Sequence, residues 1–214
     1  MPNRFQRILR SLAFFAVPVV RWVMRRSVST DPWERLDVQP RPVYHGAQHD
    51  ENFREYLRAS SSVTVSSMHE VEAWLRTATY MRAADSPFDW STLPLAFEQS
   101  RAGNCLDHAL WAWWKLIDLG VAADLAIGFS NVEDLAGGRH AWVVFHQDGT
   151  RYMLESVRKD HDRPMCVPVA EVAEKYFPEF GVDARGTRFT YGGALRTLDA
   201  RLKRFDRGST RGTV

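Results

Sequence analysis

The stretch Gly103-Asn104-Cys105-Leu106-Asp107-His108-Ala109-Leu110 decides the expected fold, because it predicts a helix that begins at a cysteine. Asparagine is a favourable N-cap residue, and Gly120 is a strong signal for the end of a helix. The residues between, 105–119, are apolar almost all round and include three tryptophans. A helix without a polar face is buried, so we expect this helix to run through the centre of the core.

The segment after this helix predicts a β-hairpin that brings a histidine and a glutamate together. Asp148-Gly149 is a typical two-residue hairpin turn, and the stretches on both sides are rich in β-branched and aromatic residues. With that turn, Trp142 lies opposite Glu155, and Glu155 is the diagonal neighbour of His140, with backbones about 7–8 Å apart. One face of the hairpin is then expected to carry His140, Trp142, Val144, Met153 and Glu155. A loop one residue longer would put the histidine and the glutamate on opposite faces.

The remaining elements complete an α+β pattern, in which helices come first and an antiparallel sheet follows. A capping box at Ser67-Met68-His69-Glu70 begins a helix that the apolar spacing extends to about Ala84. We also predict helices over 51–58, 93–99 and 169–176, and strands over 122–129, 140–146 and 150–157. The expected organisation is a basic apolar segment (1–26), an extended linker rich in proline (27–50), one domain (51–206) and a flexible basic tail (207–214).

Charge and cysteine content narrow the classes of function. The net charge of the 214 residues is only +2, and residues 1–26 alone hold six arginines and no acid. The body of the chain is therefore acidic, and nothing in it favours nucleic-acid binding. Two cysteines, Cys105 and Cys166, exclude a disulfide framework and a four-cysteine zinc site. One disulfide stays open, but a nucleophilic Cys105 would have to remain a free thiol.

The first 26 residues raise a separate question of targeting. An apolar run from Ser11 to Val20 has arginines on both sides. It is shorter than the roughly 20 apolar residues that a membrane-spanning helix needs. Three interpretations stay open: a segment that docks on a membrane surface or a partner, an uncleaved signal, and a helix packed on its own domain. We favour a cytoplasmic or membrane-associated location, with secretion left open.

Cys105, His140 and Glu155 are the residue types of thiol catalysis, in a suggestive order along the chain. A free cysteine has a pKa of about 8.5, and only its thiolate is a good nucleophile. A helix N-terminus and a nearby imidazolium both lower the pKa of a thiol, and a carboxylate can orient the imidazole. Each residue also has a purely structural explanation. Cys105 could be a small hydrophobic residue, His140 a hydrogen-bonding residue and Glu155 a solvated strand residue. Together they favour the catalytic interpretation.

The stretch from about Ser67 to Glu155 resembles the transglutaminase-like superfamily, a branch of the papain-like cysteine enzymes. The resemblance covers about 90 of the 214 residues. The matching features are Gly103-Asn104-Cys105, Leu119-Gly120, His140-Ala141-Trp142, Asp148-Gly149, Tyr152-Met153-Leu154-Glu155 and, upstream, Trp90-Ser91-Thr92-Leu93-Pro94. The chain departs from the family pattern at Glu155, where relatives more often have aspartate. It also has Asn-Cys-Leu-Asp where some bacterial branches have Asp-Cys-Glu-Asp.

The resemblance implies a papain-like fold and a Cys105–His140–Glu155 triad that works through a thioester acyl-enzyme. The expected substrate is a peptide or protein amide, and the reaction is hydrolysis, acyl transfer or deamidation, with no cofactor. Gln99 lies six residues before Cys105, the spacing at which papain-like enzymes place a side-chain donor to the oxyanion. Trp142 is a candidate wall of the acyl pocket.

Two alternatives remain at this point. The chain could be a catalytically inactive transglutaminase-like module that binds a peptide or protein partner, because the glutamate replaces the usual aspartate. Cys105, His108 and His140 could also nominally bind zinc, although a zinc site needs three or four converging ligands. Asp160 is a second candidate for the acid of the triad.

Overall fold

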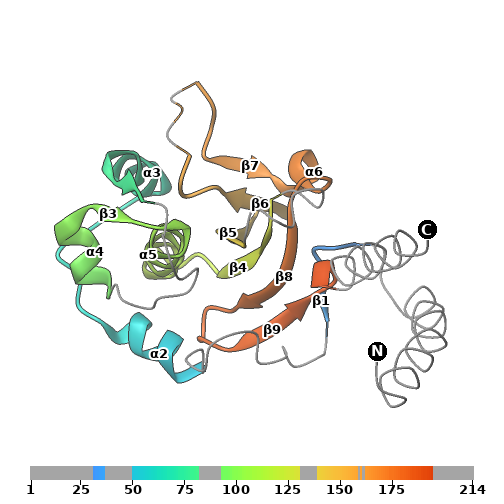
Figure 1. The fold of residues 1–214 in the computed structure, drawn as a ribbon, viewed down its shortest axis with the longest axis horizontal. Helices are drawn as coiled ribbons and strands as arrows, with labels where there is room; N and C mark the ends of the chain where they lie inside the picture. Colours follow the sequence, from blue (N-terminus) through green and yellow to red (C-terminus); the bar gives the residue numbers. More distant parts are fainter. Residues whose placement is uncertain are drawn as a thin grey trace, which may run out of the picture.

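The computed structural model describes residues 31–36, 50–81, 93–130, 139–158, 160 and 162–194, and these residues form an α+β fold (Figure 1). The helices up to and including the buried central one, which begins at Cys105, gather on one side of an antiparallel sheet. The predicted fold class is therefore confirmed. The expected N-terminal segment (1–26) and C-terminal tail (207–214) lie outside the described residues.

The sheet has seven strands in the order β1-β9-β8-β4-β5-β6-β7, and every neighbouring pair is antiparallel. The strands are β1 (Arg35–Leu36), β4 (Ala123–Phe129), β5 (His140–Gln147), β6 (Thr150–Leu154), β7 (Cys166–Pro168), β8 (Phe177–Val182) and β9 (Arg188–Tyr191). The strands β8, β4 and β5 lie at the centre, and the predicted hairpin is the β5–β6 pair.

The register of this hairpin is the one that the Asp148-Gly149 turn predicts. Both turn residues have positive φ, 50° and 76°, as a two-residue turn of the primed type requires. Gln147 pairs with Thr150, and the ladder continues to Val143 opposite Leu154. Glu155 directly follows the last residue of β6, so this register places it on the same face of the hairpin as His140.

The central helix, α5 (Cys105–Asp118), packs on one face of the sheet, and Figure 1 shows it nearly end-on, surrounded by the other helices. Its tryptophans Trp111 and Trp113 are fully buried, and the Trp113 indole donates a 3.0 Å hydrogen bond to the carbonyl of Ala123 on β4. The surrounding helices are α2 (Asp50–Arg58), α3 (Met68–Thr77) and α4 (Pro94–Ser100). The helix therefore forms the core that its apolar composition predicts.

The opposite face of the sheet is covered by a second apolar cluster. Trp142 and Met153 of the hairpin lie in it, as the predicted register requires, together with Trp33, whose ring centre is 6.0 Å from that of Trp142. Trp33 belongs to the segment that we expected to be a linker (27–50). Residues 31–36 of that segment are instead part of the sheet structure, because Trp33 is buried and β1 pairs with β9.

The chain before Cys105 differs from the prediction in one informative way. The helix predicted to run to about Ala84 ends at Thr77, and the chain then forms a short strand, β2 (Thr79–Tyr80). This strand pairs in parallel with β3 (Ala102–Gly103), directly before α5. Tertiary pairing thus overrides the local helical pattern. Two further elements are shorter than predicted: the third strand ends at Leu154, and the helix that follows Cys166, α6, covers only Val169–Val172.

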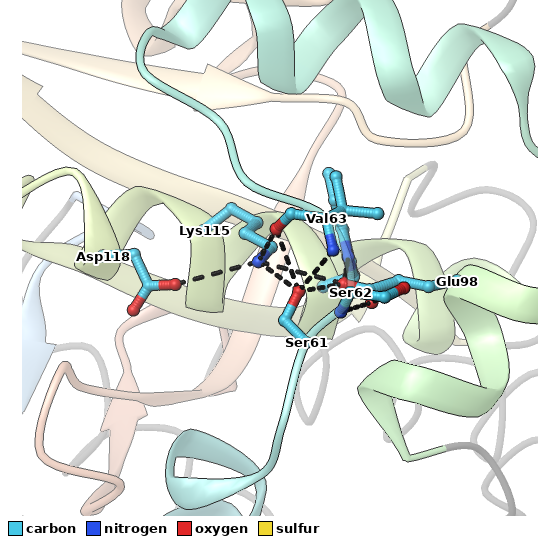
Figure 2. Close-up of polar contacts among 7 residues, drawn as sticks. Ser61, Ser62, Val63, Glu98, Lys115 and Asp118 are labelled. Atoms are coloured by element: carbon cyan, nitrogen blue, oxygen red, sulfur yellow. Dashed lines mark hydrogen bonds and ion pairs between the residues drawn. The ribbon is translucent and has the colours of Figure 1, made fainter.

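A buried ion pair ties three segments of the helical layer together (Figure 2). Lys115 of α5 and Glu98 of α4 have almost fully buried side chains, with 3.8 Å between Nζ and Oε1. The Lys115 ammonium donates to the Ser61 hydroxyl at 2.6 Å and to the Val63 carbonyl at 2.7 Å. Glu98 accepts hydrogen bonds from Ser61 Oγ, Ser62 N, Ser62 Oγ and Trp111 Nε1. Both buried charges are therefore paired and hydrogen-bonded.

Candidate active site

The N-terminus of α5 is built by a reciprocal capping box that holds Cys105 at the first helical position. The Asn104 side chain accepts from the backbone N–H groups of Leu106 at 2.8 Å and Asp107 at 3.2 Å. In return, the Asp107 carboxylate accepts from Asn104 N at 2.8 Å. Gly103 permits this close approach, because a Cβ there would lie 2.7 Å from Cβ of Asp107. Cys105 is half-buried and makes no disulfide.

His140 stands at the first position of β5, where it pairs with Gly128. Its Nε2 lies 2.9 Å from each carboxylate oxygen of Glu155. The side chain of Cys105 lies close enough to the imidazole to raise its pKa. The start of α5 and the start of β5 therefore bring the side chain of Cys105 near the His140–Glu155 pair.

Glu155 is buried and held from several sides. Its backbone N–H donates to the carbonyl of Met165 at 2.9 Å, which closes the loop between β6 and β7. Its carboxylate accepts from the Tyr176 hydroxyl at 2.8 Å and, more weakly, from Val157 N at 3.5 Å. Burial alone would raise the pKa of Glu155, but the hydrogen bonds and the charge of His140 lower it below its usual value. Glu155 is therefore a carboxylate.

The surroundings favour the charged imidazolium of His140. Burial alone would lower the pKa of His140, but the hydrogen bonds and charges of Cys105 and Glu155 outweigh it and raise the pKa from 6.5 to about 10. Both neighbours therefore favour the imidazolium form of His140. This is the charge arrangement that keeps a cysteine ready for nucleophilic attack.

The remaining predicted site residues are Trp142, Gln99 and Asp160. Trp142 is fully buried, with its ring centre 5.9 Å from that of His140, so it packs behind the imidazole. Gln99 is an exposed residue of α4 and makes no hydrogen bond to Cys105 or His140 in the described parts of the chain. Asp160 offers its carbonyl to Arg76, while Glu155 is the acid that contacts His140.

His108, one of the ligands in the zinc alternative, bonds to the start of its own helix instead. Nδ1 of His108 lies 2.9 Å from the carbonyl oxygen of Asn104, and the ring packs against Phe97 with 4.9 Å between ring centres. Within the described ranges, no group of three or more His, Cys, Asp or Glu residues is arranged to hold a metal ion. In the same ranges no helix is long and apolar enough to cross a membrane.

Sequence reasoning missed Tyr176, which contacts the candidate acid directly. We predicted a helix through residue 176, but α6 ends at Val172 and a turn follows, in which Tyr176 N donates to the carbonyl of Val172 at 3.0 Å. The residue lies 21 positions after Glu155, and no local pattern links the two. Only the packing of α6 beside the hairpin brings the phenol to the carboxylate.

Comparisons with known proteins identify no family for this chain. No family model matches it, and no curated protein matches it. Among solved structures it is similar to LapG of Legionella pneumophila, with a TM-score of 0.48 and 18% identity, over 75% of this chain and 91% of that one. An EGTA-treated form of LapG gives a TM-score of 0.45 and 16% identity over the same shares. A proposed cysteine protease from Cytophaga hutchinsonii gives a TM-score of 0.36 and 16% identity, over 56% of this chain and 40% of that one.

Proposed function

We propose that this protein is a cysteine-dependent amide-bond enzyme, a peptidase or an acyltransferase or deamidase, in which Cys105, His140 and Glu155 act together. One observation carries the proposal: His140 has the buried Glu155 carboxylate 2.9 Å from Nε2, and the side chain of Cys105 is near enough to help raise the pKa of the imidazole. A structural histidine needs no thiol at a helix N-terminus. The combination is the one that nucleophilic thiol catalysis requires.

The proposed reaction begins with a thiolate–imidazolium pair. Cys105 Sγ attacks the carbonyl carbon of an amide, and the carbonyl π electrons move to oxygen. The backbone N–H of Cys105 can donate to this oxyanion, because the first N–H groups of a helix have no intrahelical acceptor. His140 then gives its proton to the leaving nitrogen, the C–N bond breaks, and a thioester on Cys105 remains.

The second half of the reaction resolves the thioester. Neutral His140 removes a proton from water or from an amine, which attacks the thioester carbonyl, and the sulfur leaves as thiolate. Water gives hydrolysis or deamidation, and an amine gives acyl transfer. In both halves of the reaction, Glu155 accepts a hydrogen bond from Nε2 of His140 and stabilises the imidazolium, as the acid of a serine triad does. We propose a peptide or protein amide as substrate, and a membrane surface or partner as the contact of residues 1–26.

Acylation by p-nitrophenyl acetate tests this function without knowledge of the natural substrate. We expect a burst of p-nitrophenol about equal to the enzyme concentration, and an acetyl group on the Cys105 peptide after acid quenching. The ester probes the nucleophile alone, since its leaving group needs no proton. Intact and peptide mass spectrometry locates the acetyl group.

The control is Cys105→Ser, which keeps the size of the side chain but removes the thiol. A burst that persists in this variant, or wild-type protein that shows no burst and no acetylated Cys105, would contradict the enzyme. The second result is the one expected of an inactive binding module.

A further inference from the structure

We propose that Tyr176 is a positioning residue, which fixes the carboxylate of Glu155 so that both of its oxygens face Nε2 of His140. The inference deepens the proposed function and rests on it. It concerns a residue that lies outside the thiol, imidazole and carboxylate themselves. Tyr176 touches the acid and acts on the reaction only through it.

The phenol ring is itself held rigidly beside the site. Tyr176 lies in the turn between α6 and β8, and its ring packs edge-on against Trp142 with 5.2 Å between ring centres. The ring centre of His140 is 6.4 Å away. Trp142 is fully buried and lies on the same strand as His140. Packing against it therefore positions the Tyr176 ring next to the site.

The hydroxyl is a hydrogen-bond donor that stays protonated. Its oxygen lies 2.8 Å from Oε2 of Glu155. Burial and the neighbouring carboxylate raise the pKa of Tyr176 well above its usual value. An ionised carboxylate only accepts hydrogen bonds, so the phenol must be the donor.

A glutamate needs this support more than an aspartate does. Its carboxylate is separated from the backbone by one more rotatable bond, so more side-chain freedom must be removed to hold both oxygens 2.9 Å from Nε2 of His140. Val157 N, at 3.5 Å, is too distant to hold it alone. Tyr176 supplies a short, charge-assisted hydrogen bond of 2.8 Å to Oε2 of this carboxylate. This explains how the chain keeps an oriented acid with glutamate at position 155.

The test is a double-mutant cycle between Tyr176→Phe and Glu155→Gln, read by alkylation of Cys105 with iodoacetamide in the full chain. Phenylalanine keeps the ring packing and removes only the hydroxyl. Tyr176→Phe is expected to slow alkylation at pH 7 by about tenfold in the wild-type background, because the lost bond is to a charged group. In Glu155→Gln the same change is expected to cost less than about twofold, since the charge that it orients is gone.

Tyr152→Phe is the matched control. Tyr152 stacks on Phe145, with 5.6 Å between ring centres, in the core cluster on the α5 side of the sheet. Its rate should equal that of the wild type. A second readout, the NMR titration of the His140 imidazole, should give a lower pKa in Tyr176→Phe than in the wild type. A purely structural tyrosine would leave that titration unchanged.

The outcomes separate this inference from the proposed function. If Glu155→Gln slows alkylation but Tyr176→Phe does not, or if Tyr176→Phe costs as much in Glu155→Gln as in the wild type, the positioning role is wrong and the triad stands. If Glu155→Gln itself leaves alkylation unchanged, the proposed function fails first. A tenfold loss that depends on Glu155 supports the role of Tyr176.

Discussion

Replacing His140 with alanine is expected to slow the alkylation of Cys105 by iodoacetamide at pH 6 by about a hundredfold. At this pH an ordinary cysteine is almost entirely protonated and reacts slowly, because the thiolate is the nucleophile. In the wild type, Cys105 and the buried Glu155 both raise the pKa of His140, and we expect the resulting imidazolium to favour the thiolate. Removing the imidazole removes the group that holds the proton, and losses of this kind are typically 10²–10⁴-fold.

The chain supplies sharp controls for this experiment. His146 lies on the same strand, β5, but is exposed, so His146→Ala should react like the wild type. The other cysteine is a poor competitor, because burial and the neighbouring Glu72 raise the pKa of Cys166 far above its usual value. Peptide mapping after labelling assigns the site. Equal rates for the wild type and His140→Ala would contradict an activated Cys105.

Replacing Glu98 with leucine is expected to lower the free energy of unfolding by about 3–5 kcal/mol. The substitution leaves the buried ammonium of Lys115 without its buried acid, and it removes the acceptor of Ser62 N and of the Trp111 indole. Asp118, 3.8 Å from Lys115 Nζ, is half exposed and compensates only weakly. Urea unfolding followed by tryptophan fluorescence measures the change.

Two further variants show whether the loss arises from the unpaired charge. Glu51→Leu removes an exposed acid that pairs with arginines on α2, and it should cost less than about 1 kcal/mol. The double variant Glu98→Leu/Lys115→Met should be more stable than Glu98→Leu alone, because it removes the unpaired cation. If Glu98→Leu lowers the free energy of unfolding no more than Glu51→Leu does, the buried pair does not hold α4 and residues 61–63 on α5.

The parts of the fold that depend on local chemistry follow from the sequence. The Asp148-Gly149 turn sets the register of β5 and β6, and that register places Glu155 on the side of His140. Asn104 and Gly120 bracket α5, whose apolar surface predicts its burial. These signals lie within a few residues of the structure that they specify, so one sequence is enough to interpret them.

The parts that depend on distant contacts do not follow from the sequence. The early end of α3 is set by pairing of Thr79 with Ala102, across more than twenty residues. The strands β8 and β9 and the segment around Trp33 complete the sheet without a strong local pattern. Lys115 follows a run of apolar residues in α5, and only the structure shows Glu98 as its buried partner. Tyr176 joins the site in the same way, through packing.

The most direct test of the proposed site is the titration of the His140 imidazole by NMR in the chain of 214 residues. We predict that the pKa of His140 is raised from 6.5 to about 10, because Cys105 and Glu155 both favour the imidazolium. We also predict that this pKa falls in Cys105→Ser and falls again when Glu155→Gln is added. An imidazole that titrates near 6.5 in the wild type, unchanged by either substitution, would contradict the claim that these three residues form one charge-coupled site.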